Sequence, residues 1–190
     1  MTNHAPCLTA GFVVVTVVMG TTGAATAHHQ DGVGVHQPEA VPAEPRVRSS
    51  HPGLSAVIRT ASERSMTFRG LLETIEATDG IVYVEHSICP WRARGCLLST
   101  VTISGRYRVL QIVVNANARE DHLMGTIGHE LQHAIEVLSY RNIRTASALY
   151  LFYRRKGLLM GRVFETSAAV KVGNSVLTEV RRSPSTASLP

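Results

Sequence analysis

Hydrophobic side chains recur at helical intervals over several stretches of the chain. Residues 54–78 carry them with an interruption at 65–67, which predicts two short helices. From Asp121 the interval is again about 3.6 residues, which predicts one helix with an apolar face of Leu123, Ile127, Leu131, Ile135 and Leu138. Asp121 fits the N-cap or the first turn of this helix. Two more helices are predicted over 145–156 and 164–181, separated by glycines.

Three shorter runs alternate between apolar and polar residues or are rich in β-branched ones, as strands are. They cover residues 81–85, 97–103 and 109–115, and the second is joined to the third through residues 104–107. We predict that the three strands form an antiparallel meander. The fold class is therefore α+β: a small antiparallel sheet of about three strands, packed with helices that cover one of its faces.

The first 27 residues have the pattern of a secretory signal peptide. They contain no Lys, Arg, Asp or Glu, residues 8–20 are apolar, and small residues ending in Ala25-Thr26-Ala27 follow. This ending predicts cleavage after Ala27, so the protein is expected to be secreted or periplasmic. An uncleaved membrane anchor is the alternative, although the apolar stretch is short for a bilayer span, which needs about 20 residues. No other contact with a membrane is expected.

One folded domain, residues 53–182, is expected between two extended segments. Residues 28–52 have no hydrophobic periodicity and contain four prolines, which is typical of a disordered linker. Residues 183–190 form a small polar tail that we expect to be flexible. The chain has 190 residues, of which 44% are hydrophobic, and this fits a single core better than a disordered or multi-span membrane protein.

The formal net charge of +5 raises the question of nucleic-acid binding. The basic residues are nearly all arginines and are scattered along the chain, with the densest groups at 154–156 and 181–182. No stretch resembles a basic tract interleaved with aromatic residues, so no nucleic-acid partner is expected. Solvated helix faces and helix ends account for these charges.

Cys89 and Cys96 lie between the first two predicted strands, in the sequence CPWRARGC. In an exported chain, two cysteines that close so short a loop are expected to form a disulfide. Zinc ligation is the alternative, but no second pair of Cys or His residues has zinc-finger spacing. The disulfide would hold the loop and stabilise the fold by about 2–3 kcal/mol in the chain-entropy model.

An H-E-x-x-H motif, residues 129–133, lies in the middle of the helix predicted from Asp121. Four residues make one helical turn plus about 40°, so the imidazoles of His129 and His133 project from one side and can bind one Zn²⁺. Glu130 lies beside them, where its carboxylate can act as general base on a zinc-activated water. The alternative is a pair of solvated histidines in an i,i+4 contact, with no metal.

A hydrolytic zinc site needs a third protein ligand and one open position. Glu136 is almost on the same face, but it lies two turns from His129 on the same helix, about 10 Å along the axis, which is too far for a compact tetrahedron. Glu165 fits better, because it is expected to open the last helix, and the small residues 167–169 would let that helix pack closely. The alternative role of Glu165 is a first-turn acid favoured by the helix dipole.

The motif, with a glutamate on a following helix, resembles the gluzincin metallopeptidases. Residues 65–180 resemble small bacterial proteins that reduce this zincin fold to a minimal catalytic core. The resemblance implies that His129, His133 and Glu165 bind zinc and that Glu130 polarises the water. The implied function is zinc-dependent hydrolysis of peptide (amide) bonds in a peptide or protein substrate.

The resemblance also implies that an edge strand, 97–103 or 109–115, pairs with an extended substrate. The chain differs from the family in having no N-E-x-x-x-D pattern around Glu165, since Ala169 stands at the aspartate position, and in having no evident large C-terminal domain. A carboxylate that orients a ligand histidine is therefore unassigned. The alternative function is a zinc-binding interaction or structural module with little or no catalysis. Candidate oxyanion donors are Tyr140, Tyr150 and Tyr153, and the alternative for each is an ordinary position on an amphipathic helix.

Overall fold

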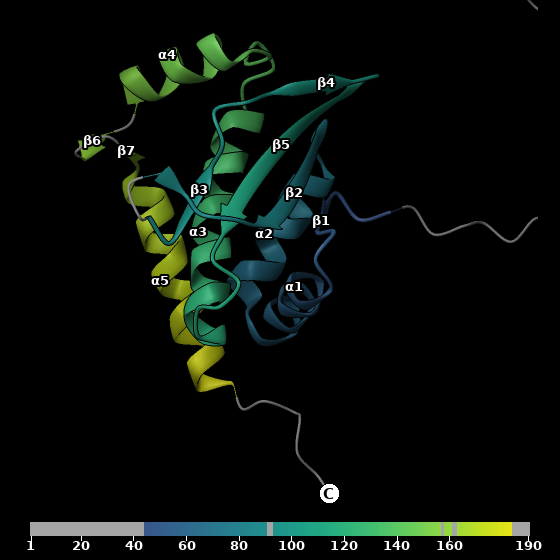
Figure 1. The fold of residues 1–190 in the computed structure, drawn as a ribbon, viewed down its shortest axis with the longest axis vertical. Helices are drawn as coiled ribbons and strands as arrows, with labels where there is room; N and C mark the ends of the chain where they lie inside the picture. The colour runs from purple at the N-terminus through teal and green to yellow at the C-terminus, as the bar shows by residue number, and fades with distance from the viewer. Residues whose placement is uncertain (1–43, 91–92, 157, 161–162, 184–190) are drawn as a thin grey trace, which may run out of the picture. The chain divides into compact units, whose positions relative to one another are not determined.

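The computed structural model describes residues 44–90, 93–156, 158–160 and 163–183 (Figure 1). The predicted signal peptide with its cleavage point after Ala27, the linker up to residue 43 and the tail beyond Ser183 lie outside these residues. Within the described part of the chain, none of the helices has the length and apolar character that a membrane span requires.

Two helices precede most of the sheet, as predicted. α1 covers Pro52–Arg64 and α2 covers Met66–Glu76. Ser65 separates them because its backbone is extended, and its hydroxyl accepts a hydrogen bond of 2.9 Å from the N–H of Phe68, which caps the start of α2. Each helix buries one apolar face in the core.

The main sheet contains five short strands: β1 (Val47–Arg48), β2 (Gly80–His86), β3 (Gly95–Leu97), β4 (Thr102–Ser104) and β5 (Tyr107–Val114). Their order is β1-β2-β5-β3, and β4 also pairs with β5. β3 and β4 are antiparallel to β5, whereas β1 is parallel to β2 and β2 is parallel to β5. The sheet is therefore mixed.

The prediction of an antiparallel meander was wrong for the first of its strands. The chain leaves β2, passes to the far side of β5 and returns through β3 and β4, so that β5 lies between β2 and β3. The antiparallel relation of the second and third predicted runs is confirmed, and their turn uses Gly105 at φ 56°. Alternation determines the face that a residue occupies but not the strand that lies beside it.

β1 lies inside the segment predicted as a disordered linker, residues 28–52. Val47 and Arg48 pair with Val82 and Tyr83 of β2, and Val47 is buried. The linker prediction was therefore wrong for the end of this segment, and the folded domain begins before residue 53. A strand of two residues is too short to produce a period in the sequence.

The three later helices are α3 (Glu120–Leu138), α4 (Ala146–Lys156) and α5 (Ser167–Arg182), and a hairpin of β6 (Leu158–Met160) and β7 (Val163–Glu165) stands between the last two. Asp121 lies in the first turn of α3. Glu165 was expected to open the last helix, but it ends β7. The helix begins later because Thr166 caps it, with its hydroxyl accepting a hydrogen bond of 3.2 Å from the N–H of Ala169.

Helices cover one face of the sheet. Val84 of β2 and Ile112 of β5 are buried, whereas Gln111, on the other face, is exposed. The buried face joins apolar side chains of α1, α2, α3 and α5 in one core. This placement positions α3, which carries the H-E-x-x-H motif, between the sheet and α5 (Figure 1).

α3 and α5 run side by side (Figure 1). They approach closely at glycines. A Cβ atom on Gly125 would lie 3.1 Å from the carbonyl oxygen of Gly173, and one on Gly128 would lie 2.9 Å from Val176 Cγ2. Of the small residues 167–169, which were expected to allow close packing, only Ala169 is buried. The close contact therefore depends mainly on the glycines.

Candidate metal centre

α3 presents His129 and His133 on one side, with ring centroids 4.9 Å apart. The end of β7 brings the Glu165 carboxylate to the same place, where Oε1 lies 3.3 Å from His129 Nε2 and 3.4 Å from His133 Nε2. One ligand atom from each of these residues lies within 4.8 Å of the other two. The structure thus brings together the three residues predicted as metal ligands.

Two of the three spacings between these atoms are those of a tetrahedral metal site. In a tetrahedral site with bonds of about 2.0–2.1 Å, ligand atoms lie roughly 3.3 Å apart. The two distances from Glu165 are 3.3 and 3.4 Å, whereas N–H···O hydrogen bonds are usually about 2.7–3.2 Å long. Two imidazole nitrogens and one carboxylate oxygen are a donor set that zinc accepts, and they leave a fourth position open.

Glu136 holds His133 on the side away from the ligand group. Its Oε2 lies 3.0 Å from His133 Nδ1, and its Oε1 accepts a hydrogen bond of 2.7 Å from the hydroxyl of Thr166. Because Nδ1 is engaged in this way, Nε2 of His133 is left available to bind a metal ion. Thr166 also donates its backbone N–H to Glu165 Oε1 at 2.8 Å, so one residue orients two members of the site.

Neither Glu136 nor Thr166 was predicted in this role. Glu136 was considered only as a ligand, and the ligand group of the described residues does not include it. Glu136 is the carboxylate partner of a candidate ligand histidine, a role that the sequence left unassigned. Its position three residues after His133, one turn along the helix, is the signal that could have revealed it. No sequence signal could have linked Thr166 to Glu136, because the two residues lie 30 positions apart in the chain.

The two histidines have different electrostatic surroundings. Burial lowers the pKa of His129 below its ordinary value, and the nearby Glu165 only partly opposes this. Burial also acts to lower the pKa of His133, but the hydrogen bond with Glu136 and the surrounding carboxylates outweigh it, so that pKa is raised. At Glu136, the hydrogen bonds with His133 and Thr166 outweigh burial and lower the pKa of the carboxyl. Glu136 is therefore ionised at neutral pH and can hold the proton of His133 on Nδ1.

Glu130 lies beside the ligand group, between α3 and β3. It is 6% exposed, and burial raises its pKa to about 7, which is the range that a general base needs at neutral pH. Its Oε2 accepts a hydrogen bond of 2.9 Å from the N–H of Leu97. This close approach requires glycine at position 95, where a Cβ atom would lie 2.6 Å from Thr126 Cγ2 and 3.1 Å from Glu130 Cγ.

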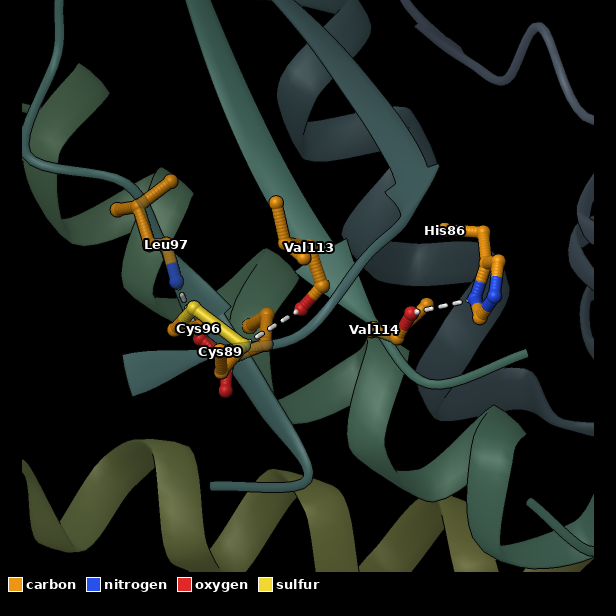
Figure 2. Close-up of a disulfide and its surroundings, with 7 residues drawn as sticks. His86, Cys89, Cys96, Leu97, Val113 and Val114 are labelled. Atoms are coloured by element: carbon orange, nitrogen blue, oxygen red, sulfur yellow. Dashed lines mark hydrogen bonds between the residues drawn. A yellow bond between two sulfur atoms is a disulfide. The ribbon is translucent and has the colours of Figure 1, made fainter. Parts of the chain in front are cut away.

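The predicted disulfide joins Cys89 to Cys96, whose Cα atoms are 6.0 Å apart. Cys96 lies in β3 opposite Val113 of β5, and Cys89 Sγ lies 3.2 Å from the carbonyl oxygen of Val113 (Figure 2). The disulfide therefore ties the loop after β2 to the edge strand. It also bears on the site, because the residue after Cys96 is Leu97, which donates to Glu130.

A cavity of about 850 Å³ contains the ligand group, a volume typical of ligand sites. Its walls come from β3 and the residues on either side of it, and from α3, α4, β7 and α5. Of the candidate oxyanion donors, Tyr150 and Tyr153 line the cavity and Tyr140 does not. The hydroxyl of Tyr153 donates to the carbonyl oxygen of His133 at 3.2 Å. Tyr150, which is half exposed, is therefore the better placed of the two to meet a substrate.

Evidence for the site comes from its geometry. A comparison of the chain with protein-family models, with curated proteins and with solved structures found no match.

Proposed function

We propose that the protein is an exported zinc metallopeptidase that hydrolyses peptide bonds. The observation that carries the proposal is the convergence of His129, His133 and Glu165 beside the buried carboxylate of Glu130. Three protein ligands with an open fourth position are typical of catalytic zinc sites, whereas structural sites are closed by four. Export is supported by the signal-peptide pattern of residues 1–27 and by the disulfide.

Each residue of the site has a separate role in the proposed hydrolysis. Zinc held by the three ligands would polarise the scissile carbonyl and lower the pKa of water toward about 7. Glu130 accepts a proton from the attacking water and donates it to the leaving amine, and no covalent bond forms between enzyme and substrate. Glu136 and Thr166 keep His133 and Glu165 in place during these steps.

The substrate is proposed to lie along β3 in extended form. β3 is an edge strand, whereas β5, which contains most of the other predicted candidate, has neighbours on both sides. The N–H of Leu98 donates to Gln111 of β5, so the alternate residues Gly95 and Leu97 direct their backbone groups away from β5. The N–H of Leu97 is taken by Glu130, and the other outward groups can pair with a peptide. The edge-strand role fits the zincin-like and gluzincin-like fold that the motif implies.

The test of the proposed function is the Glu130→Gln variant, with Glu120→Gln as its control. Glu120 is an exposed acid on the same helix. We expect Glu130→Gln to keep its zinc, because Glu130 is not a ligand, and to hydrolyse an unbiased peptide library about a hundredfold or more slowly. Glu120→Gln should match the unaltered protein in both measurements. Glu165→Ala should lose stoichiometric zinc when the purified protein is analysed for metal.

A zinc-binding structural or interaction module is the second candidate. The hydrogen bond between Glu130 and Leu97 favours it, because it gives the buried carboxylate a partner that joins α3 to the sheet. On this alternative the zinc-loaded protein cleaves no peptide of the library, and Glu130→Gln changes stability but not biological activity. That pair of results would reject the peptidase.

A further inference from the structure

The net charge of the chain is concentrated in one segment. Of its 19 basic and 14 acidic residues, residues 140–156 contain five basic and no acidic ones. They are Arg141, Arg144, Arg154, Arg155 and Lys156. The rest of the chain holds fourteen of each sign, so residues 140–156, hereafter the basic segment, account for the whole excess of +5.

The charges of the basic segment are not neutralised locally. All five cations are exposed, and none forms an ion pair with a carboxylate among the residues that the structure describes. Two of them contact aromatic rings instead. The Arg154 guanidinium lies 5.9 Å from the ring centroid of Tyr150, and Lys156 donates a hydrogen bond of 2.9 Å to the Tyr140 hydroxyl. Leu151 and both tyrosines are themselves exposed.

The basic segment adjoins the candidate metal centre. On α4, Leu149, Tyr150 and Tyr153 line the cavity that contains the ligand group. Tyr150 connects the basic segment to the cavity, because it lines the cavity and is 50% exposed, with the Arg154 guanidinium over its ring. A chain that leaves the cavity past Tyr150 therefore meets Arg154.

The lining of the cavity has a compatible charge. Arg94, in the loop before β3, is a basic lining residue, and the acidic lining residues are Glu130 and Glu165, which belong to the site itself. No acidic side chain other than these two would repel an anionic substrate from the described walls of the cavity. Charge complementarity of this kind selects between partners more than it adds affinity.

We propose that the substrates are extended polypeptides with Asp or Glu side chains on the part that passes Tyr150, that Arg154 binds these acids, and that Arg155, the next residue of α4, adds to the positive charge there. The inference rests on the proposed peptidase function. A peptide is favoured over other anionic partners by the position of Tyr150. Tyr150 connects Arg154 to the cavity of the proposed peptidase site, and a polypeptide is the anionic partner that this cavity would take.

The test uses the full-length, zinc-saturated Glu130→Gln protein, which binds peptides without cleaving them. Fluorescent peptides with one apolar centre carry glutamate, serine or lysine flanks. We expect the glutamate peptide to bind most tightly and its Kd to rise with salt. The double variant Arg154→Glu, Arg155→Glu should weaken this binding about tenfold or more. Its matched control is Arg59→Glu, Arg69→Glu, which makes the same charge change at exposed positions of α1 and α2 and should bind like the parent.

Equal affinity for the three peptides, or equal weakening in the two double variants, would overturn the inference. Binding of phosphatidylglycerol vesicles or of a DNA duplex is measured with the same proteins. The inference would also be overturned if either of them bound the protein more tightly than the glutamate peptide does and if the Arg154→Glu, Arg155→Glu variant lost that binding. Cleavage of the library by the unaltered protein without preference for acidic peptides would overturn the inference and leave the peptidase intact. Selective binding of the glutamate peptide with no cleavage by the unaltered protein would reject the peptidase and retain the acidic-peptide site.

Discussion

Thr166 is a single residue on which two parts of the metal centre depend. Its hydroxyl donates to Glu136, its backbone N–H donates to Glu165, and the same hydroxyl caps α5. Thr166→Val keeps the shape of the side chain and the N–H but removes the hydroxyl. We expect zinc affinity, measured by competition with a chromophoric chelator, to fall about tenfold because His133 loses its fixed orientation. The lost cap should also lower the free energy of unfolding by about 1 kcal/mol.

Two further variants separate this role from a general effect on α5. Thr166→Ser keeps the hydroxyl and should restore zinc affinity. Thr178→Val removes a hydroxyl that bonds only the carbonyl oxygen of Asn174 on an exposed part of α5, and it should leave zinc affinity unchanged. Unaltered affinity in Thr166→Val would mean that Glu136 holds His133 without help.

At the scale of the elements, Glu179 fastens α5 to the start of α2. Its carboxylate accepts hydrogen bonds from the Ser65 hydroxyl at 2.6 Å, from the Thr67 N–H at 3.0 Å and from the Thr67 hydroxyl at 2.5 Å. Burial acts to raise the pKa of Glu179, but these hydrogen bonds outweigh it and bring the pKa below the ordinary 4.5. The ionised carboxylate therefore stabilises the fold above pH 4.5, and this contribution is lost as the pH falls through the lowered pKa.

Glu179→Gln should reveal this contribution through its pH dependence. At pH 7 we expect it to lower the free energy of unfolding by about 1 kcal/mol, because the charged acceptor is lost. The difference from the unaltered protein should shrink in acid, where Glu179 is protonated in both the folded and the unfolded chain. Urea unfolding at a series of pH values measures it, with the exposed Glu73→Gln as control. A difference that is constant with pH would contradict the assignment.

The C-terminal end of α3 is held by Arg108 of β5, which is fully buried. Its guanidinium pairs with Asp79 at 2.6 Å. It also donates to main-chain carbonyl oxygens at and after the end of α3, those of Val137, Leu138, Tyr140 and Ile143. A cation is favoured at this end of a helix. Arg108 thus fixes the sheet against the helix that carries both ligand histidines.

Arg108→Met fills much of the same volume but leaves Asp79 and the buried carbonyl oxygens without a partner. We expect a loss of about 3–5 kcal/mol in the free energy of unfolding, measured by chemical denaturation. Asp79→Asn should cost less, because the Asp79 side chain is 31% exposed and water can replace part of the interaction. Equal losses in the two variants would show that the ion pair, rather than the carbonyl contacts, is the main contribution.

The helices could be predicted from the sequence because their period is a local property. The interruption at Ser65 and the helix that begins at Glu120 both follow from the spacing of apolar residues. The order of the strands could not be predicted, because a run such as 81–85 has the same pattern whether its neighbour is β3 or β5. Glu165 was placed at the right site but in the wrong element, because the cap at Thr166 was not recognised.

In the site, too, local relations could be predicted from the sequence and contacts between distant elements could not. His129, Glu130 and His133 could be found together because one helical turn places them together. The contact of Glu130 with Leu97 spans 33 residues, and that of Thr166 with Glu136 spans 30. Such contacts depend on how elements pack, which no local pattern records.

At the scale of the whole folded unit, the candidate metal centre joins three separate parts of the chain. α3 carries two of the candidate ligands, β7 carries the third, and β3, held by the disulfide, lies against Glu130. A metal bound at this point therefore links α3 to the segment that leads into α5. Binding that occurs only in the folded state adds to the stability of that state by mass action.

Zinc should consequently raise the melting temperature of the protein. Variants that lack a ligand should show a smaller rise, and variants that keep all three ligands should show the full rise. At a free zinc concentration of about 100 times Kd the gain is about 2.7 kcal/mol, which for a domain of this size corresponds to a rise of about 10 °C. Glu165→Ala should lose most of this rise in a calorimetric scan, because two histidines alone bind more weakly. Glu130→Gln should keep it, because Glu130 contacts β3 and is not a ligand. A full rise in Glu165→Ala would place the third ligand elsewhere, and its loss in Glu130→Gln would make Glu130 a ligand rather than a base.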